Sequence, residues 1–156
     1  MAIVKRLKEL LDRERVGYQH VPHPEVFTMP EVAAVEHEKG RHVIKTVALK
    51  ADGELVLAAV PAALKVDEKA LAKLMKAKEV VAAEEHEFAN AFPDCEVGAM
   101  PPFGDLYGVP LYLDKRLTEC DEVVFNAGTH TDTIKMAFAD FKRLASPEIG
   151  EFAVMK

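Results

Sequence analysis

Two runs of β-branched and aliphatic residues on either side of Asp52-Gly53 constrain the fold of this chain more than any other feature. The first run covers residues 42–51 and the second covers residues 54–60. An Asp-Gly pair between two such runs is typical of a tight hairpin, because the turn needs positive φ angles that these residues tolerate. The sequence therefore predicts two antiparallel strands joined at Asp52-Gly53.

Helical and extended patterns alternate on both sides of this hairpin. Leu7, Leu10 and Leu11 recur at helical spacing and predict a helix that ends before Gly17, and Thr28 is the predicted N-cap of a second helix that stops at Gly40. Further helices are predicted at 66–76, 84–92 and 140–145, and further strands at 18–21, 79–83, 109–113, 122–126, 133–138 and 150–155. This mixture predicts an α+β fold with a central mixed β-sheet flanked by helices.

The composition fits a single domain over residues 1–156 without a linker, because 49% hydrophobic content supplies one sizeable core. Charges interrupt the apolar residues at the start of the chain, so we expect neither a signal peptide nor a membrane span, and a cytoplasmic location by default. Cys95 and Cys120 lack the spacing of a metal site and are predicted to be reduced thiols. A net charge of −6 disfavours broad contact with nucleic acid and leaves only a local basic patch for that purpose.

Lys45 stands out in the predicted strand 43–49. Alternation places it on the same face as Val43, Val47 and Leu49, where a lysine is costly unless an anionic or polar group meets it. The alternative is an edge-strand lysine whose ammonium reaches water. Lys45 is therefore a candidate site residue.

Glycine and proline are concentrated between Gly98 and Gly104, in the middle of a globular chain. Glycines permit close approach and prolines stiffen the backbone, so this loop could present successive N–H groups to a carboxylate, a phosphate or a developing oxyanion. The alternative is a rigid surface turn without a ligand.

A polar cluster over residues 126–133 follows the strand predicted at 122–126. Within it, His130 could orient a substrate or a water molecule, and Asp132 could be its partner or form a local turn. The alternative is a histidine without a functional role. His20 and His23 have the spacing of a metal pair, but no third ligand lies near them, so we expect a surface loop and no metal site.

Four lysines recur at intervals of four, four and three residues and are expected to line one face of the helix predicted at 66–76. Such a row could meet the phosphates of a nucleic acid, and the alternative is an ordinary solvated face. The residues are Lys65, Lys69, Lys73 and Lys76.

Together these features resemble the YbaK / prolyl-tRNA-synthetase-associated editing family from about Tyr18 to the C-terminus. The motifs that carry the resemblance are, in order, Lys45 within Val-Ile-Lys-Thr-Val, Gly98 to Pro102 as the Gly-x-x-x-Pro loop, and Gly128-Thr-His130. The resemblance implies hydrolysis of the ester that joins a wrong amino acid to the terminal adenosine of a tRNA. It implies no cofactor.

The resemblance also implies roles for individual residues. Lys45, His130 and Gly98 are the expected catalytic residues. The expected substrate-binding residues are Thr46, Ala99, Met100, Pro101, Pro102, Phe103, Gly128 and Thr129. The expected partner is the acceptor end of a mischarged tRNA, an aminoacyl-tRNA synthetase could be a second partner, and nothing predicts a membrane or DNA. Because no nucleophilic triad is evident, water attack assisted by a ribose hydroxyl of the substrate is favoured.

The features point to more than one substrate. Lys45-Thr46 looks like the cysteinyl-tRNA(Pro) deacylases, whereas His130 looks like the alanyl-tRNA(Pro) deacylases, and Pro101 stands where many relatives have a hydroxyl residue. The expected activity is a free-standing deacylase that acts in trans on tRNA(Pro) carrying Ala, Cys or another small amino acid. The alternatives are a non-catalytic module that retains the pocket to bind a tRNA end, nucleotide or amino acid, and a structural interaction protein.

Overall fold

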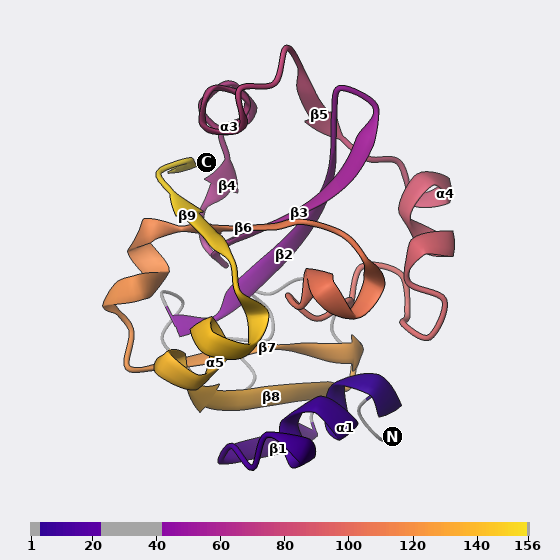
Figure 1. Cartoon of the computed structure of the whole chain (residues 1–156), viewed down its shortest axis with the longest axis vertical. Helices are drawn as coiled ribbons and strands as arrows, with labels where there is room; N and C mark the ends of the chain where they lie inside the picture. The colour runs from indigo at the N-terminus through magenta and orange to yellow at the C-terminus, as the bar shows by residue number, and fades with distance from the viewer. Residues whose placement is uncertain (1–3, 23–41, 156) are drawn as a thin grey trace.

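The computed structural model describes residues 4–22 and 42–155 (Figure 1). The helix predicted from Thr28 to Gly40, and His23, lie outside these described residues. In the described part, the predicted α+β fold with a mixed sheet is confirmed.

The larger sheet has the strand order β5-β2-β3-β6-β9. Its first three strands are antiparallel to one another. β6 pairs with β3 in parallel and β9 pairs with β6 in parallel, so the sheet is mixed. The predicted hairpin is its centre: Asp52 (φ 49°) and Gly53 (φ 87°) form the turn, and both adopt the positive φ that such a turn requires. The strands are β5 (Val80–Ala82), β2 (Ile44–Ala51), β3 (Glu54–Pro61), β6 (Leu111–Asp114) and β9 (Glu148–Gly150).

A second, three-stranded antiparallel sheet was not predicted as a separate layer. Its order is β1-β8-β7, and Figure 1 shows it beside α1 and away from α3. Its strands are β1 (Tyr18–Pro22), β7 (Glu122–Thr129) and β8 (Asp132–Ala137). The strand predicted at 122–126 is longer in the structure, because residues 127–129 continue β7 through a bulge beyond Asn126. The sequence did not predict this extension, because polar residues at a strand end usually indicate an exposed turn. Here Asn126 and Thr129 are buried.

The main core lies between the two sheets and α1 (Lys5–Arg13). Leu7 and Leu11 are fully buried, as their helical spacing predicts. The rings of Phe103, Phe125 and Phe141 meet within 5.7 Å of one another between their centroids, and Phe141 comes from α5 (Phe138–Ala145). A smaller cluster on the other face of the larger sheet buries Leu71 of α3 (Glu68–Met75).

Several predicted boundaries shift for local reasons. The helix predicted at 66–76 begins at Glu68, because the Asp67 side chain caps it, and it ends at Lys76 in a left-handed conformation (φ 59°). The helix predicted at 84–92 is divided into α4 (Glu85–Phe88) and a 3-10 turn at Ala89–Ala91. The strand predicted at 150–155 is instead β9 and β10 (Ala153–Val154), and β10 pairs with β4 (Lys65–Val66). Further 3-10 turns cover Gly104–Tyr107 and Lys115–Glu119.

Candidate active site

The candidate site lies along a free edge of β2. One edge of β2 pairs with β3 along its whole length, whereas β5 covers the other edge only from residue 49 to residue 51. At the start of β2, a parallel bridge between Val43 and Val124 brings β7 alongside. Among the described residues, no strand pairs with this edge between the bridge and residue 49, and a gap is left there.

Thr46 turns its backbone polar groups toward this gap. Successive residues of a strand direct their N–H and C=O groups to opposite edges. The Val43 carbonyl accepts from Ala62 N–H (2.8 Å) beyond the β3 end, whereas the Ala48 carbonyl accepts from Ala83 N–H (3.1 Å) at the opposite edge. Thr46 lies two residues before Ala48, so its N–H and C=O point to the same edge as those of Ala48. This is the free edge, where they can pair with an extended ligand.

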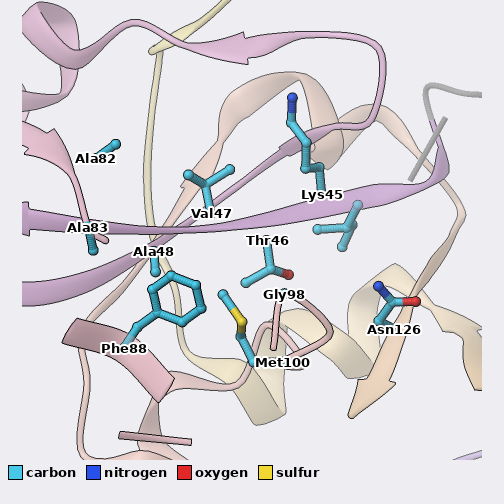
Figure 2. A pocket seen from close by; sticks show the side chains of 11 residues that line it. Lys45, Thr46, Val47, Ala48, Ala82, Ala83, Phe88, Gly98, Met100 and Asn126 are labelled. Carbon is cyan, nitrogen blue, oxygen red and sulfur yellow. The ribbon is translucent and has the colours of Figure 1, made fainter. Parts of the chain in front are cut away.

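A cavity of about 310 Å³ fills the gap (Figure 2). Its size falls within the range of small-molecule sites. Polar groups come from Lys45, Thr46 and Asn126, and Gly98 supplies bare backbone. The remaining wall is apolar and comes from β2, the end of β5, α4 and the loop after Gly98. These residues are Ile44, Val47, Ala48, Ala82, Ala83, Phe88 and Met100.

Lys45 borders this cavity, but its ammonium does not point at Gly98. The half-buried side chain donates from Nζ to the Leu64 carbonyl at 2.5 Å. Figure 2 shows Lys45 and Val47 on one side of β2, and Thr46 with Gly98 on the other. The Gly98 turn therefore faces Thr46, whereas Lys45 borders the cavity from the other side of β2.

The glycine loop begins with a tight turn. The Ala99 N–H donates to the Glu96 carbonyl (3.0 Å), and Gly98, the third residue of the turn, has a φ of +83°. A turn of this kind needs positive φ at its third position, which explains glycine there. Within the described chain, the N–H groups of Gly98 and Met100 donate to no backbone carbonyl, so they are the candidates for anion binding.

His130 lies against this turn. It is one of the two residues that join β7 to β8, and only 5% of it is exposed. Its Nε2 lies 2.7 Å from the Val97 carbonyl, and its backbone N–H donates to Glu96 Oε1 (2.6 Å). A Cβ on Gly98 would stand 3.7 Å from His130 Cε1. His130 therefore holds the turn and does not line the cavity.

Gly128 binds the same turn through its backbone. Its N–H donates to the Ala99 carbonyl (2.9 Å), and its carbonyl accepts from the Glu96 N–H (2.7 Å). The turn is thus fixed to the β7–β8 hairpin from two directions. Glu96, which contributes its backbone and its carboxylate to this arrangement, was missed by the sequence analysis because no local pattern singles it out.

The remaining predicted substrate residues divide between cavity and core. Met100 reaches the cavity, whereas Ala99, Pro101 and Pro102 are buried and do not line it. Phe103 belongs to the aromatic core beside Phe125. The predicted row of N–H groups is therefore confined to the first part of the loop, because its second half turns inward to fill the core.

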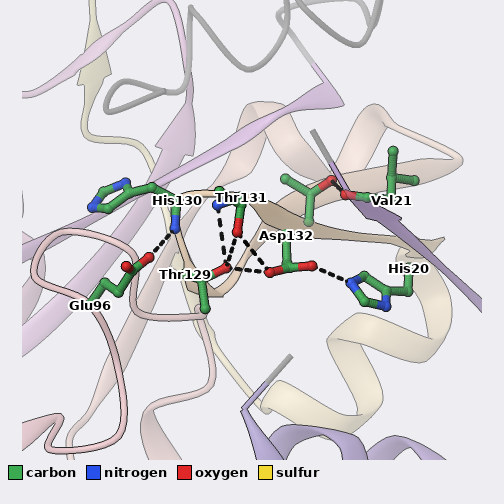
Figure 3. A network of polar contacts seen from close by, with 8 residues as sticks. His20, Val21, Glu96, Thr129, His130, Thr131 and Asp132 are labelled. Carbon is green, nitrogen blue, oxygen red and sulfur yellow. Dashed lines mark hydrogen bonds and ion pairs between the residues drawn. The ribbon is translucent and has the colours of Figure 1, made fainter. Parts of the chain in front are cut away.

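Thr129 belongs to a buried polar network that also contains Asp132 (Figure 3). Asp132 is fully buried, and its carboxylate accepts from the hydroxyls of Thr129 (2.6 Å) and Thr131 (3.0 Å). Its other oxygen lies 2.6 Å from His20 Nε2. The partner of Asp132 is thus His20 rather than His130, and His20 lies in β1 rather than in the predicted surface loop.

The hydrogen bonds to Asp132 predict that the stability of the protein depends on pH in the acid range. Burial raises the pKa of the Asp132 carboxyl. The hydrogen bonds from Thr129, His20 and Thr131 together lower this pKa by more than burial raises it, so it lies below the ordinary value of 3.8. A carboxyl with a lowered folded-state pKa stabilises the fold above its unfolded value and loses this effect as the pH falls through the folded value.

We therefore expect Asp132→Asn to lower the free energy of unfolding at pH 7 by about 2 kcal/mol, because a charged acceptor of several hydrogen bonds is lost. Below pH 4 the difference between the variant and the unmodified protein should shrink. Urea unfolding at pH 7, 5, 4 and 3 measures this, with the exposed Asp105→Asn as the control for lost charge. A difference that stays constant down to pH 3 would refute the role of this carboxylate.

The lysine row is only partly helical. Lys69 and Lys73 lie on α3, whereas Lys65 belongs to β4 and Lys76 caps the helix C-terminus. All four are exposed, and none lines the cavity beside Lys45. Their predicted contact with tRNA stays a prediction.

Cys95 is poorly suited to nucleophilic attack. Burial raises the pKa of its thiol to about 11, so very little thiolate exists at neutral pH. Its sulfur lies 3.2 Å from the Tyr107 hydroxyl, which in turn donates to Asp94 (2.9 Å). Arg6 of α1 bonds to Asp94 (2.7 Å), so the group fastens α1 to the loop region.

Among the described residues, none of the helices has the length and apolar character needed to cross a membrane.

The sequence pattern of the aminoacyl-tRNA editing domain matches residues 23–144. The chain is also 30% identical over 156 residues to the multifunctional Ser/Thr-tRNA deacylase ProXp-y of Escherichia coli strain K12, a match that covers 95% of this chain and 91% of the relative.

Solved structures share the fold at lower identity. A hypothetical protein superposes with a TM-score of 0.86 at 14% identity and covers 96% of this chain and all of the other. A proposed trans-editing enzyme for prolyl tRNA synthetase superposes with a TM-score of 0.81 at 18% identity and covers 96% of both chains. The resemblance inferred from the sequence motifs is confirmed: the chain belongs to the aminoacyl-tRNA editing domain family, a family of aminoacyl-tRNA deacylases.

Proposed function

We propose that this protein acts in trans on tRNA mischarged with a small amino acid, with serine or threonine as the first candidates. The cavity at the free edge of β2 carries this proposal, because it joins Lys45, Thr46 and the Gly98 turn around a space of suitable size. The choice of serine and threonine follows the name of the Escherichia coli relative. Alanine and cysteine, suggested by the motifs, are the next candidates.

The Thr46 edge positions the aminoacyl group. Its carbonyl accepts from the α-amino group of the substrate, and its N–H donates to an oxygen of the ester region, much as an added strand pairs with a sheet edge. This pairing recognises groups that every aminoacyl ester shares. It therefore fixes the ester without selecting the side chain.

Hydrolysis then proceeds by attack of water on the ester carbonyl. The bond between the carbonyl carbon and the ribose oxygen breaks, the ribose oxygen takes up a proton, and the free amino acid leaves. The N–H groups of Gly98 and Met100 stabilise the oxyanion that forms on the way. Water attacks rather than the Cys95 thiol, because that thiol is almost fully protonated at neutral pH. We assign the direction of the water to a neighbouring ribose hydroxyl of the tRNA.

Lys45 holds the charged end of the tRNA from the rim. Its flexible stem lets the ammonium exchange the Leu64 carbonyl for a phosphate or carbonyl oxygen of the aminoacyl-adenosine. His130 is a positioning residue in this scheme, because it keeps the Gly98 turn against the hairpin. With a net charge of −6, the protein contacts few phosphates, and the exposed lysines near α3 are candidates for those contacts.

A deacylation panel tests this function. We expect the unmodified protein to release amino acid from tRNA(Pro) charged with Ser, Thr, Ala or Cys faster than from tRNA(Pro) charged with Pro, by at least about tenfold for the best substrate. The measurement is loss of radiolabelled aminoacyl-tRNA, with buffer alone as the blank. Hydrolysis of none of the mischarged esters above that blank would refute the proposed function.

A further inference from the structure

Asn126 carries a buried polar group that the fold does not satisfy. Only 7% of the residue is exposed, and its side-chain carbonyl finds no hydrogen-bond partner among the described residues. Buried polar atoms in folded proteins are nearly always bonded, so an exception in a cavity indicates a place for a ligand. Asn126 borders the same cavity as Thr46 and Gly98.

The backbone around Asn126 directs it to this place. β7 runs parallel to the start of β2 at the bridge between Val43 and Val124, and Asn126 lies two residues beyond that bridge, where the cavity opens. The regular pairing of β7 with β8 breaks immediately after Asn126. Bulges of this kind commonly redirect side chains beside active sites. Figure 2 shows Asn126 on the same side of β2 as Thr46, Gly98 and Met100.

The chemistry of the amide favours a hydroxyl over other groups of the substrate. An amide offers both an acceptor and donors, and a hydroxyl can donate and accept in return. An ammonium only donates, and the Thr46 carbonyl at the strand edge already suits it. The neighbouring wall of Ile44, Phe88 and Met100 is apolar, so it accepts the carbon atoms of a small side chain and offers that hydroxyl no partner.

We propose that Asn126 selects the amino acid to be removed, because its side-chain carbonyl accepts a hydrogen bond from the side-chain hydroxyl of a seryl or threonyl ester. This inference rests on the proposed function and assigns its specificity to one residue. An alanyl ester leaves the amide unsatisfied in the complex, which disfavours it strongly, because a site built to bond a hydroxyl rejects analogues that lack one. A cysteinyl ester is disfavoured less, since its thiol bonds weakly.

Asn126→Leu, which keeps a similar shape without the amide, tests this role. We compare kcat/KM for Ser-, Thr- and Ala-tRNA(Pro) in the unmodified protein, in Asn126→Leu and in Asn90→Leu, the same change at the exposed asparagine. The expected result is that the ratio of seryl to alanyl hydrolysis falls at least about 100-fold in Asn126→Leu and stays unchanged in Asn90→Leu. The melting temperature of Asn126→Leu should not fall, because an unsatisfied polar group is replaced by an apolar one.

The remaining outcomes decide between this role and others. An unchanged ratio, or an equal loss on all three esters, would overturn the assignment, because a structural residue or one that binds the α-amino group acts on every ester alike. If Asn126→Leu does not fold, Asn126→Ala replaces it, and the same fall in the ratio is required. Failure of the proposed function is distinct, since the unmodified protein would then cleave no ester. Cleavage of alanyl esters as fast as seryl esters by the unmodified protein would overturn the assignment of Asn126 alone.

Discussion

Lys45→Ala is expected to lower kcat/KM for the preferred mischarged tRNA at least about 100-fold, the scale seen when one fixed electrostatic contact to a reacting group is lost. In the folded protein the ammonium is bonded to the Leu64 carbonyl and stands beside the cavity. The substrate offers a negatively charged or carbonyl oxygen in exchange. Removing the ammonium removes that exchange but leaves the cavity wall in place.

A structural explanation for such a loss must be separated from a chemical one. Lys45→Met keeps most of the apolar stem and loses only the charge, so it should match Lys45→Ala in activity and remain close to the unmodified protein in melting temperature. Lys50→Ala is the control on the same strand, since Lys50 pairs with Glu87 and does not line the cavity. Full activity of Lys45→Met would show that the ammonium has no part in the reaction.

Local sequence patterns were sufficient for the elements whose causes are local. The Asp52-Gly53 turn follows from the φ angles it needs, and the burial of Leu7 and Leu11 follows from helical spacing. The Gly98 turn also has a local cause. These features recur in any chain that carries the same residues, and they are enough to outline the mixed sheet and its central hairpin.

The face of β2 that meets the cavity could not be predicted in this way. Both faces of the larger sheet are covered, so Ile44 and Ala48 are buried in one cluster and Leu49 and Ala51 in the other. Alternation then correctly groups Lys45 with Val47 but does not identify the side on which the cavity opens. That depends on where β5 stops and where β7 diverges, which are properties of the assembled fold.

Long-range polar partners were hidden for a related reason. His20 and Asp132 are 112 positions apart, and Glu96 and His130 are 34 apart. Neither pair has a spacing that a helix or a hairpin would produce. Each is brought together only when β1 pairs with β8 and when the Gly98 turn packs on the β7–β8 hairpin. Asn126 lies in the polar cluster predicted at 126–133, but only its burial beside the cavity distinguishes it from its neighbours.

Gly128→Ala is expected to destabilise the protein by about 3 kcal/mol, through two separate effects. Gly128 has a φ of +100°, which costs a residue with a side chain on the order of 1–3 kcal/mol. A Cβ at this position would also lie 2.1 Å from Val4 Cγ1, and such overpacking adds a further 1–3 kcal/mol by the usual order of magnitude. The free energy of unfolding in urea measures the sum.

A double-mutant cycle separates these two effects. Val4→Ala removes the methyl group that the new Cβ would strike and keeps the backbone hydrogen bond from Val4 to Ala127 (3.0 Å). The double variant should therefore be more stable than the sum of the single changes predicts, by about 1 kcal/mol or more. Exact additivity would show that the collision is avoided in another way and that backbone strain alone accounts for the loss.

The same cycle shows whether the anchoring of the Gly98 turn matters for hydrolysis. Gly128 holds the turn through hydrogen bonds to Ala99 and Glu96, so a strained backbone there should shift Gly98 against His130. If the double variant regains stability while hydrolysis stays low, the turn must be held in its observed position for the reaction. Recovery of both together would show that the collision with Val4, rather than backbone strain at Gly128, had displaced the turn and lowered hydrolysis.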